Sequence, residues 1–115
     1  MTSDTPIRAW EVVVVPFPYS ERLAEKRRPA VVVSNARLHG EGYLWIAMIT
    51  GAGKEGRAGD VAILDLEHAG LPGASRVRAS KVATIEPVRI VRTIGSLAEP
   101  ERAAVRREVA GFLAK

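Results

Sequence analysis

The chain of 115 residues contains no cysteine, which excludes disulfides and cysteine-ligated metal sites, and its length is that of one domain spanning residues 1–115. It shows neither a signal-peptide pattern nor an apolar run near the roughly 20 residues that span a bilayer, so we expect a cytoplasmic protein without membrane contact. The net charge of +4 arises in residues 76–115, where nine Lys and Arg face four Asp and Glu, and this excess predicts an acidic partner, nucleic acid before membrane.

The first strand is predicted over Trp10–Phe17, WEVVVVPF, where β-branched residues run into prolines that cannot donate to a strand ladder. The polar segment Tyr19–Arg27 follows, and its length favours a functional loop over a tight hairpin. Ala30–Val33 then forms a second strand without a polar residue, which is typical of a short strand covered on both faces.

Three basic residues, Lys26, Arg27 and Arg28, directly precede Pro29 and the second strand. Pro29 restricts its own φ and favours an extended Arg28, so the guanidinium of Arg28 is held at the start of a strand. A rigidly held guanidinium suits phosphate binding because its planar fork of donors is already placed. The competing interpretation is that the three residues are a solvated loop that keeps the strand soluble.

Four more strands are predicted in the rest of the chain, at Tyr43–Thr50, Asp60–Leu64, Arg76–Ile85 and Val88–Ile94. The segments 36–42 and 67–75 between them are rich in turn residues and are expected to be loops. The strand Arg76–Ile85 alternates cations with apolar or small residues, which indicates one wet, basic face, and Arg89 and Arg92 are expected outside on the last strand.

The C-terminal segment Leu97–Lys115 changes to a helical period. Its apolar residues fall on one helical face, and Pro100 stands near the start, where a missing N–H costs nothing. The members of that face are Val105, Val109, Phe112 and Leu113, with Arg102, Arg106 and Arg107 on the opposite side. About six short strands and one closing helix, without βαβ alternation, favour a mainly β fold, a small and strongly bent antiparallel barrel.

The two histidines, His39 and His68, are far apart in sequence and neither belongs to a metal-ligand spacing. We therefore predict neither a metal nor another cofactor.

Five segments, in this order and spacing, resemble the PemK/MazF family of toxin endoribonucleases: EVVVVPFP, KRRPAVVVSN, WIAMIT, GLPGASRVRASKVATI and VRTIGSL. The resemblance implies an SH3-like barrel with a C-terminal helix that acts as a homodimer. It further implies metal-independent cleavage of single-stranded RNA (mRNA) at a short sequence, and inhibition by a cognate antitoxin whose disordered tail lies in the RNA groove.

The resemblance also assigns roles to residues. Arg28 matches the arginine of the family's RP motif and Thr50 the threonine that ends the third strand, and the family pattern ties both to catalysis. Arg78 matches an arginine implicated in some relatives, but Ser80 replaces the aspartate two residues on, and Lys81 stands where relatives have glutamine.

RNA cleaves itself when its 2′-hydroxyl attacks the adjacent phosphorus in line. Arg28 is expected to neutralise the charge that develops on the phosphate, and Thr50 to hold the reacting group in place. A carboxylate can act as the general base when it is partly desolvated, and Glu25 or Glu21 corresponds to the acidic loop residue of the relatives. His39 is the second choice.

Further residues are predicted to bind RNA. Tyr19 is expected to stack on a base, and a cationic set to contact phosphates, namely Lys26, Arg27, Arg76, Arg78 and Lys81. The alternative is that the cations of Arg76–Ile85 form only a solvated strand face. Two other functions stay open: a barrel that binds RNA or antitoxin without cutting, which Ser80 favours, and a gyrase poison like CcdB, whose C-terminal aromatic chemistry has only Phe112 as a counterpart here.

Overall fold

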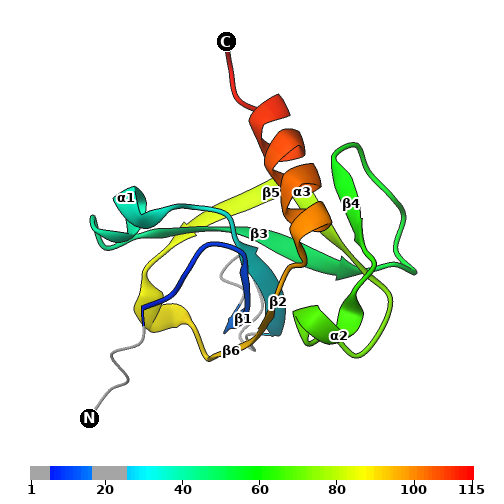
Figure 1. Cartoon of the computed structure of the whole chain (residues 1–115), viewed down its shortest axis with the longest axis horizontal. Coiled ribbons are helices and arrows are strands. Elements are labelled where there is room, and N and C mark those ends of the chain that lie inside the picture. Colours follow the sequence, from blue (N-terminus) through cyan, green and yellow to red (C-terminus); the bar gives the residue numbers. More distant parts are fainter. Residues whose placement is uncertain (1–5, 17–25) are drawn as a thin grey trace.

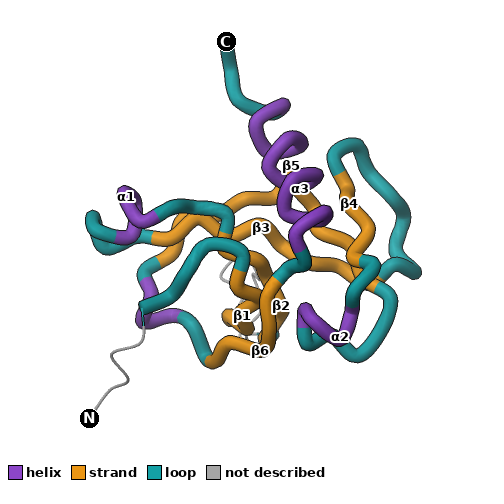
Figure 2. The backbone as a smooth tube through the Cα atoms, viewed as in Figure 1, coloured by secondary structure: helices purple, strands orange, loops and turns teal. Residues whose placement is uncertain are grey.

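The computed structural model describes residues 6–16 and 26–115. Within these residues, six strands form one antiparallel sheet in the order β4-β5-β3-β2-β1-β6. The sheet curls into a half-barrel, and helix α3 lies across it (Figures 1 and 2). The predicted fold class, a mainly β antiparallel barrel with a C-terminal helix, is confirmed.

The elements have the following bounds. The strands are β1 Glu11–Pro16, β2 Arg27–Val32, β3 Leu44–Gly51, β4 Asp60–Ile63, β5 Ser75–Ile85 and β6 Arg92–Ser96. The helices are α1 Ala36–His39, α2 Leu66–Ala69, the 3-10 helix η1 Pro87–Arg89, and α3 Glu99–Gly111.

Both faces of the central strands are covered, because alternate residues point to opposite sides of a sheet and both sets are apolar here. On the side of α3, Val12 and Val31 pack with Val105 of the helix. On the other side, Val13 and Ala30 belong to a second cluster. The prediction that the second strand is covered on both faces is therefore confirmed.

β5 changes face at a bulge. Ala47 of β3 pairs with Val82, but the next residue, Met48, pairs with Arg78, so residues 79–81 have no place in the ladder to β3. Because side chains alternate along a strand, this odd insertion moves the following residues to the opposite side of the sheet. Val77 accordingly lies in the cluster under α3, whereas Ala83 lies in the other cluster.

The closing helix is shorter than expected. α3 ends at Gly111, so the prediction that Phe112 and Leu113 continue its apolar face is wrong, and their side chains are 52% and 66% exposed. Val105 is fully buried as expected. The start of α3 is fixed by Glu101, whose Oε2 accepts hydrogen bonds from the backbone N–H groups of Leu64 (2.6 Å) and Asp65 (2.9 Å). No helix in the described part of the chain is long and apolar enough to cross a membrane.

Two other expectations need correction. The predicted last strand, Val88–Ile94, is replaced by the 3-10 helix η1 and by β6, which begins only at Arg92. Pro87 occupies the first turn of η1, where its fixed φ suits a helical turn. Segments 36–42 and 67–75 were expected to be loops. The four-residue helix α1 occupies the first part of segment 36–42, and the four-residue helix α2 extends into segment 67–75.

Candidate functional site

Arg28 and Thr50 lie on the same face of the sheet, near the ends of neighbouring strands. β2 and β3 pair with Ala30 opposite Met48. That pair is the last of the ladder, and Arg28 and Thr50 each lie two residues beyond it on their strands. Because side chains two residues apart along a strand share a face, Arg28 and Thr50 lie on the face of Ala30 and Met48. A guanidinium and a hydroxyl are thus placed where both can contact one phosphate.

The row continues onto a third strand. Thr50 pairs with Arg76 of β5, so Arg28, Thr50 and Arg76 follow one another across β2, β3 and β5. Both Arg28 and Thr50 are half-buried, which limits the freedom of their side chains while leaving their ends accessible. Arg28 is also held in the ladder to β1, where it pairs with Val15. The backbone that carries it is therefore rigid.

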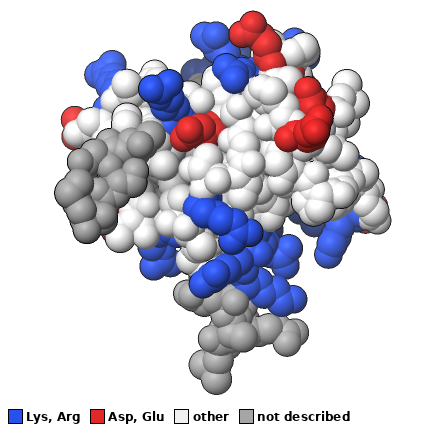
Figure 3. All heavy atoms as spheres, turned by 60° about the horizontal axis from the view of Figure 1, so that its bottom comes forward, with Lys and Arg blue, Asp and Glu red and all other residues white. Residues whose placement is uncertain are grey.

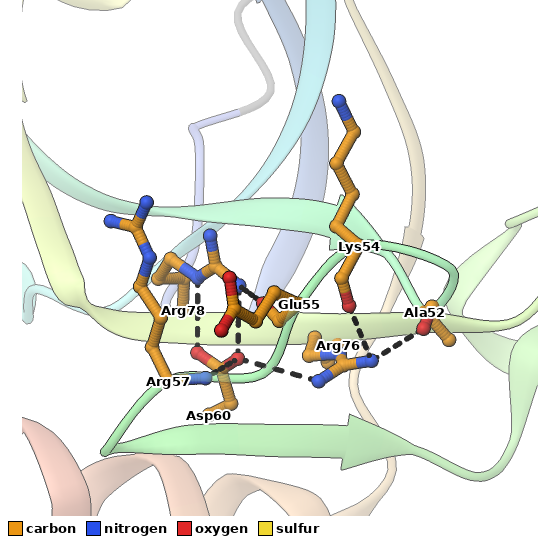
Figure 4. Close-up of polar contacts among 7 residues, drawn as sticks. All are labelled: Ala52, Lys54, Glu55, Arg57, Asp60, Arg76 and Arg78. Carbon is orange, nitrogen blue, oxygen red and sulfur yellow. Dashed lines mark hydrogen bonds and ion pairs between the residues drawn. The ribbon is translucent and has the colours of Figure 1, made fainter.

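Two arginines of β5 fasten the loop between β3 and β4 to the sheet (Figure 4). Arg78 donates from Nε and Nη2 to the two carboxylate oxygens of Asp60, over 3.1 and 3.0 Å, and from Nη2 to the carbonyl of Glu55 over 2.9 Å. Arg76 donates through Nη2 to the carbonyls of Ala52 and Lys54, and its Nη1 lies 3.6 Å from Asp60 Oδ2. Asp60, Arg76 and Arg78 together will be called the Asp60 latch.

The contact between Arg78 and Asp60 favours the charged form of both side chains. The hydrogen bond from Arg78 lowers the pKa of Asp60, against the opposing effect of burial, and the backbone N–H of Arg57 acts in the same direction as Arg78. The same hydrogen bond raises the pKa of Arg78. The side chains of Arg78 and Asp60 are only 10% and 9% exposed, so the pair is shielded from water. The ion pair therefore stays formed at neutral pH.

The latch corrects the expectation of one wet, basic face on β5. Arg78 is buried and paired, and Arg76 is engaged with backbone carbonyls, whereas Lys81, in the bulge, is exposed. Sequence reasoning missed Asp60 as the partner. Asp60 and Arg78 are in contact because they are directly paired between β4 and β5, and no local sequence pattern predicts that register.

A basic cleft opens at the start of β2, on the face of the sheet that Val14 and Pro29 share and opposite the face of Arg28 and Thr50. It has a volume of about 450 Å³, and its walls come from β2, β1, β6 and the loop after α2. The residues that line it are Val14, Arg27, Arg28, Pro29, Leu71, Pro72, Gly73, Ala74, Ser75, Arg92 and Ile94. Figure 3 brings the lower side of Figure 1 forward and shows Lys and Arg gathered in the lower middle of that face. Among the described residues, three arginines line the cleft, and sequence reasoning had assigned Arg27 and Arg28 to the site but not Arg92.

The structure does not bring His39, the second choice of base, together with Arg28 and Thr50. Its Nε2 lies 2.8 Å from Ser34 Oγ, and Ser34 Oγ accepts a hydrogen bond from the backbone N–H of Trp45 over 2.9 Å. Trp45 and Thr50 are five residues apart along β3, which corresponds to about 16 Å at the usual rise of a strand. His39 therefore holds α1 against the far end of β3.

Some predicted site residues lie outside the described residues: Tyr19, Glu21 and Glu25. Lys26 and Arg27 are exposed at the start of β2. Among residues 6–16 and 26–115, no group of three or more His, Asp or Glu side chains is placed to hold a metal ion.

A second groove, of about 620 Å³, lies at the end of β3 away from Thr50. Trp10, Leu38 and Trp45 contribute apolar surface to it, and Arg37 and Arg106 line it as well. It is larger than the cleft at the start of β2, but it contains neither Arg28 nor Thr50. We therefore centre the candidate site on the row of Arg28, Thr50 and Arg76; the smaller cleft lies at the same end of β2, on the other face of the sheet.

Solved structures share this fold. MazF from Deinococcus radiodurans superposes with a TM-score of 0.74 at 23% sequence identity, covering 95% of this chain and 97% of that one. The Mycobacterium tuberculosis toxin MazF-mt6 gives 0.70 at 20% identity, covering 88% and 93%. A mycobacterial endoribonuclease in complex with its cognate antitoxin gives 0.70 at 14% identity, covering 95% and 99%. At these identities the likeness establishes the fold alone.

The family assignment comes from sequence. No curated protein of significantly similar sequence was found. The sequence model of the PemK-like, MazF-like toxins of type II toxin–antitoxin systems, however, matches residues 8–113, which is nearly the whole chain. The chain therefore belongs to the PemK/MazF family of type II toxins.

Proposed function

We propose that this toxin is a sequence-specific, metal-independent endoribonuclease that cleaves single-stranded RNA, mRNA above all, in the cytoplasm. The observation that carries the proposal is the placement of Arg28 and Thr50 on one face of the sheet, at adjoining ends of the neighbouring strands β2 and β3. A guanidinium and a hydroxyl on adjacent rigid strands can bind one phosphate diester from two directions. Membership of a toxin family whose structural neighbours include endoribonucleases supports the same chemistry.

The reaction requires no group beyond the RNA and side chains. The 2′-oxygen forms a bond to phosphorus while the bond from phosphorus to the 5′-oxygen breaks, which yields a 2′,3′-cyclic phosphate and a free 5′-hydroxyl. Arg28 donates hydrogen bonds to the non-bridging oxygens, where negative charge grows in the transition state. Thr50 holds a non-bridging oxygen or the attacking hydroxyl in line, which is a positioning role.

Two proton transfers accompany this step. A base accepts the proton of the 2′-hydroxyl, and an acid delivers a proton to the leaving 5′-oxygen. We assign the base to Glu25, with Glu21 as its alternative; both lie outside the described residues. The pairing of β3 with β5 puts Arg76 next in the row after Thr50, and we propose that Arg76 assists in binding a phosphate.

A cognate antitoxin is the expected partner. Neighbouring structures include MazE–MazF complexes from Deinococcus radiodurans. We propose that an acidic, disordered segment of the antitoxin of this toxin covers the cleft at the start of β2 and excludes RNA. Charge complementarity supports this placement, because three arginines of the described part of the chain line the cleft.

We also propose that the toxin is a homodimer. Trp45 and Val82 are 43% and 39% exposed, and the pairing of Ala47 with Val82 puts them diagonally next to each other on one face of the sheet. Exposed aromatic and aliphatic side chains in one patch are typical of an interface.

The test of the nuclease proposal is digestion of mixed RNA by the purified protein in the presence of EDTA, with mapping of the 5′-hydroxyl ends. We expect discrete cuts and 2′,3′-cyclic phosphate termini. Arg28→Ala should lower kcat about 10²- to 10³-fold, because a donor to the developing charge is lost, without changing the melting temperature. Arg107→Ala, on the exposed side of α3, is the matched control and should cut like the wild type.

The outcomes are distinct. Equal cutting by wild type and Arg28→Ala would identify a contaminating nuclease or a wrong site. RNA binding without products would favour the non-cleaving alternative. Inhibition of gyrase supercoiling without RNA cleavage would favour the gyrase-poison alternative.

A further inference from the structure

The Asp60 latch lies on the same face of the sheet as Arg28 and Thr50. Asp60 pairs with Arg78 between β4 and β5, and Arg78 pairs with Met48 between β5 and β3. Residues directly opposite each other in antiparallel strands have their side chains on one face, and Met48 is on the face of Arg28 and Thr50. The latch is therefore part of the surface on which we propose that RNA is cleaved.

Four backbone groups of the loop between β3 and β4 are bound by the latch (Figure 4). They are the carbonyls of Ala52 and Lys54, which accept from Arg76, the carbonyl of Glu55, which accepts from Arg78, and the N–H of Arg57, which donates to Asp60. The first of these carbonyls follows Thr50 by only two residues. The latch therefore fixes the path of the chain directly after Thr50.

The loop lies so close to Arg76 that one of its residues has no room for a side chain. A Cβ atom added at Gly56 would lie 2.7 Å from Nη1 of Arg76, which is too close for two heavy atoms that are not bonded. At Gly53, in the same loop, an added Cβ atom would meet nothing within 4 Å. A methyl group at residue 56 must therefore displace the loop or the guanidinium of Arg76, whereas the same group at residue 53 displaces nothing.

We propose that Asp60 is a positioning residue for RNA cleavage. This inference rests on the proposed nuclease function. Asp60 acts through Arg76 and Arg78, which hold the loop between β3 and β4 in place. The fixed loop keeps Thr50 aligned with Arg28 for the in-line attack of the 2′-hydroxyl, and a misplacement of about 1 Å can cost up to about 10²-fold in rate.

A role of Asp60 in charge alone would have the opposite effect. The carboxylate offsets one of the two positive charges that Arg76 and Arg78 place on this face. Asp60→Asn makes the face more positive by one charge, and a more positive face binds the phosphates of RNA better. Slower cleavage with unweakened binding therefore separates positioning from charge.

The experiment measures cleavage and binding separately, at a temperature at which circular dichroism shows every variant to be folded. Cleavage of an RNA that contains the mapped cut sequence gives kcat and KM. The same RNA, labelled with fluorescein and carrying 2′-deoxyribose at the cut position, cannot react, and its fluorescence anisotropy gives Kd. Asp60→Asn, Asp60→Glu and Gly56→Ala alter the latch, and Gly53→Ala is the matched control in the same loop. Gly70→Ala is the stability control, because Gly70 packs against β6, at the opposite edge of the sheet from β4.

Asp60→Asn should lower kcat about tenfold or more and should not raise Kd. Asp60→Glu keeps the carboxylate and should recover part of kcat. Gly56→Ala should also lower kcat about tenfold, although it changes no charge, and should change Kd by no more than about threefold. Gly53→Ala and Gly70→Ala should stay within about twofold of the wild type in kcat and Kd.

Other results would overturn the inference. Wild-type kcat in Asp60→Asn and Gly56→Ala, with cleavage still lost in Arg28→Ala, would refute the positioning role and leave the nuclease function standing. An equal fall in kcat in Gly53→Ala or Gly70→Ala would also refute it, since any change in the loop or any loss of stability would then suffice. If Asp60→Asn does not fold, the comparison of Gly56→Ala with Gly53→Ala decides alone. If the wild type does not cut RNA, the nuclease proposal and the positioning role fail together.

Discussion

Replacing Asp60 by Asn tests whether the Asp60 latch stabilises the fold. The carboxylate accepts two hydrogen bonds from Arg78 and one from the backbone N–H of Arg57 over 2.9 Å, and it is only 9% exposed. Asn keeps one acceptor oxygen and turns an NH₂ donor towards guanidinium donors. A hydrogen bond to a charged group contributes about 1.5–3 kcal/mol, so we expect a loss of about 2 kcal/mol.

This loss converts to a measurable shift in melting temperature. At about 2.1 cal/mol/K per residue, the 115 residues have an unfolding entropy of about 0.24 kcal/mol/K, so 2 kcal/mol corresponds to about 8 °C at pH 7. Thermal unfolding followed by circular dichroism measures it. Glu86→Gln is the control, because Glu86 is exposed and its side chain makes no capping hydrogen bond to η1.

The pH dependence provides an independent check. The pKa of Asp60 is lower in the folded protein than the usual value of about 3.9, so the carboxylate stabilises the fold fully above that value. This contribution disappears as the pH falls through the lowered folded pKa. Because Asn is neutral at every pH, the difference between wild type and Asp60→Asn should shrink on acidification below about pH 4. A shift at pH 7 within the roughly 2 °C of a neutral surface substitution would refute the reasoning.

Two further predictions concern packing and assembly. Gly70→Ala should lower the free energy of unfolding, measured in urea, by about 3 kcal/mol, because Gly70 has a φ of +74° and an added Cβ would meet the carbonyl of Ile94. Gly73→Ala is the control and should leave that free energy nearly unchanged, because nothing lies within 4 Å of an added Cβ there. Equal stability of the two variants would contradict this packing. Trp45→Glu should convert the proposed homodimer to a monomer in sedimentation equilibrium, whereas Val88→Glu, at an 83% exposed side chain, should leave the mass unchanged. If Trp45→Glu remains a dimer, the proposed interface at Trp45 and Val82 is wrong and the dimer forms through another surface.

The strands were largely predictable from local chemistry. A run of valines ended by prolines predicted β1, and an apolar run after Pro29 predicted β2. The alternation over Arg76–Ile85 predicted β5 to within one residue of its observed start at Ser75. Such patterns work because each strand face must be either covered or wet along its whole length. The last strand was misplaced because Val88–Ile94 alternates as a strand would, although Pro87 begins a turn of 3-10 helix there.

The candidate site was predictable only in part. Arg28 and Thr50 were identified by their resemblance to family motifs, and the alternation along β2 and β3 puts both on the face of Ala30 and Met48. Arg92 was not identified, because its place in the cleft depends on the pairing of β1 with both β2 and β6. The prediction that Arg78 lies on a wet, basic face was wrong. Its environment depends on a bulge of three residues and on Asp60, a partner 18 positions away in sequence.

The sequence by itself determined the class of fold, the order of its strands along the chain and the family of toxins to which it belongs. Hydrophobic alternation and proline placement act within a few residues and need no distant partner. Only the tertiary structure decided which cations stay exposed and which pair with Asp60. Strand pairing, bulges and the curl of the sheet join residues far apart in the chain, and the charge of an arginine says nothing of where its partner lies.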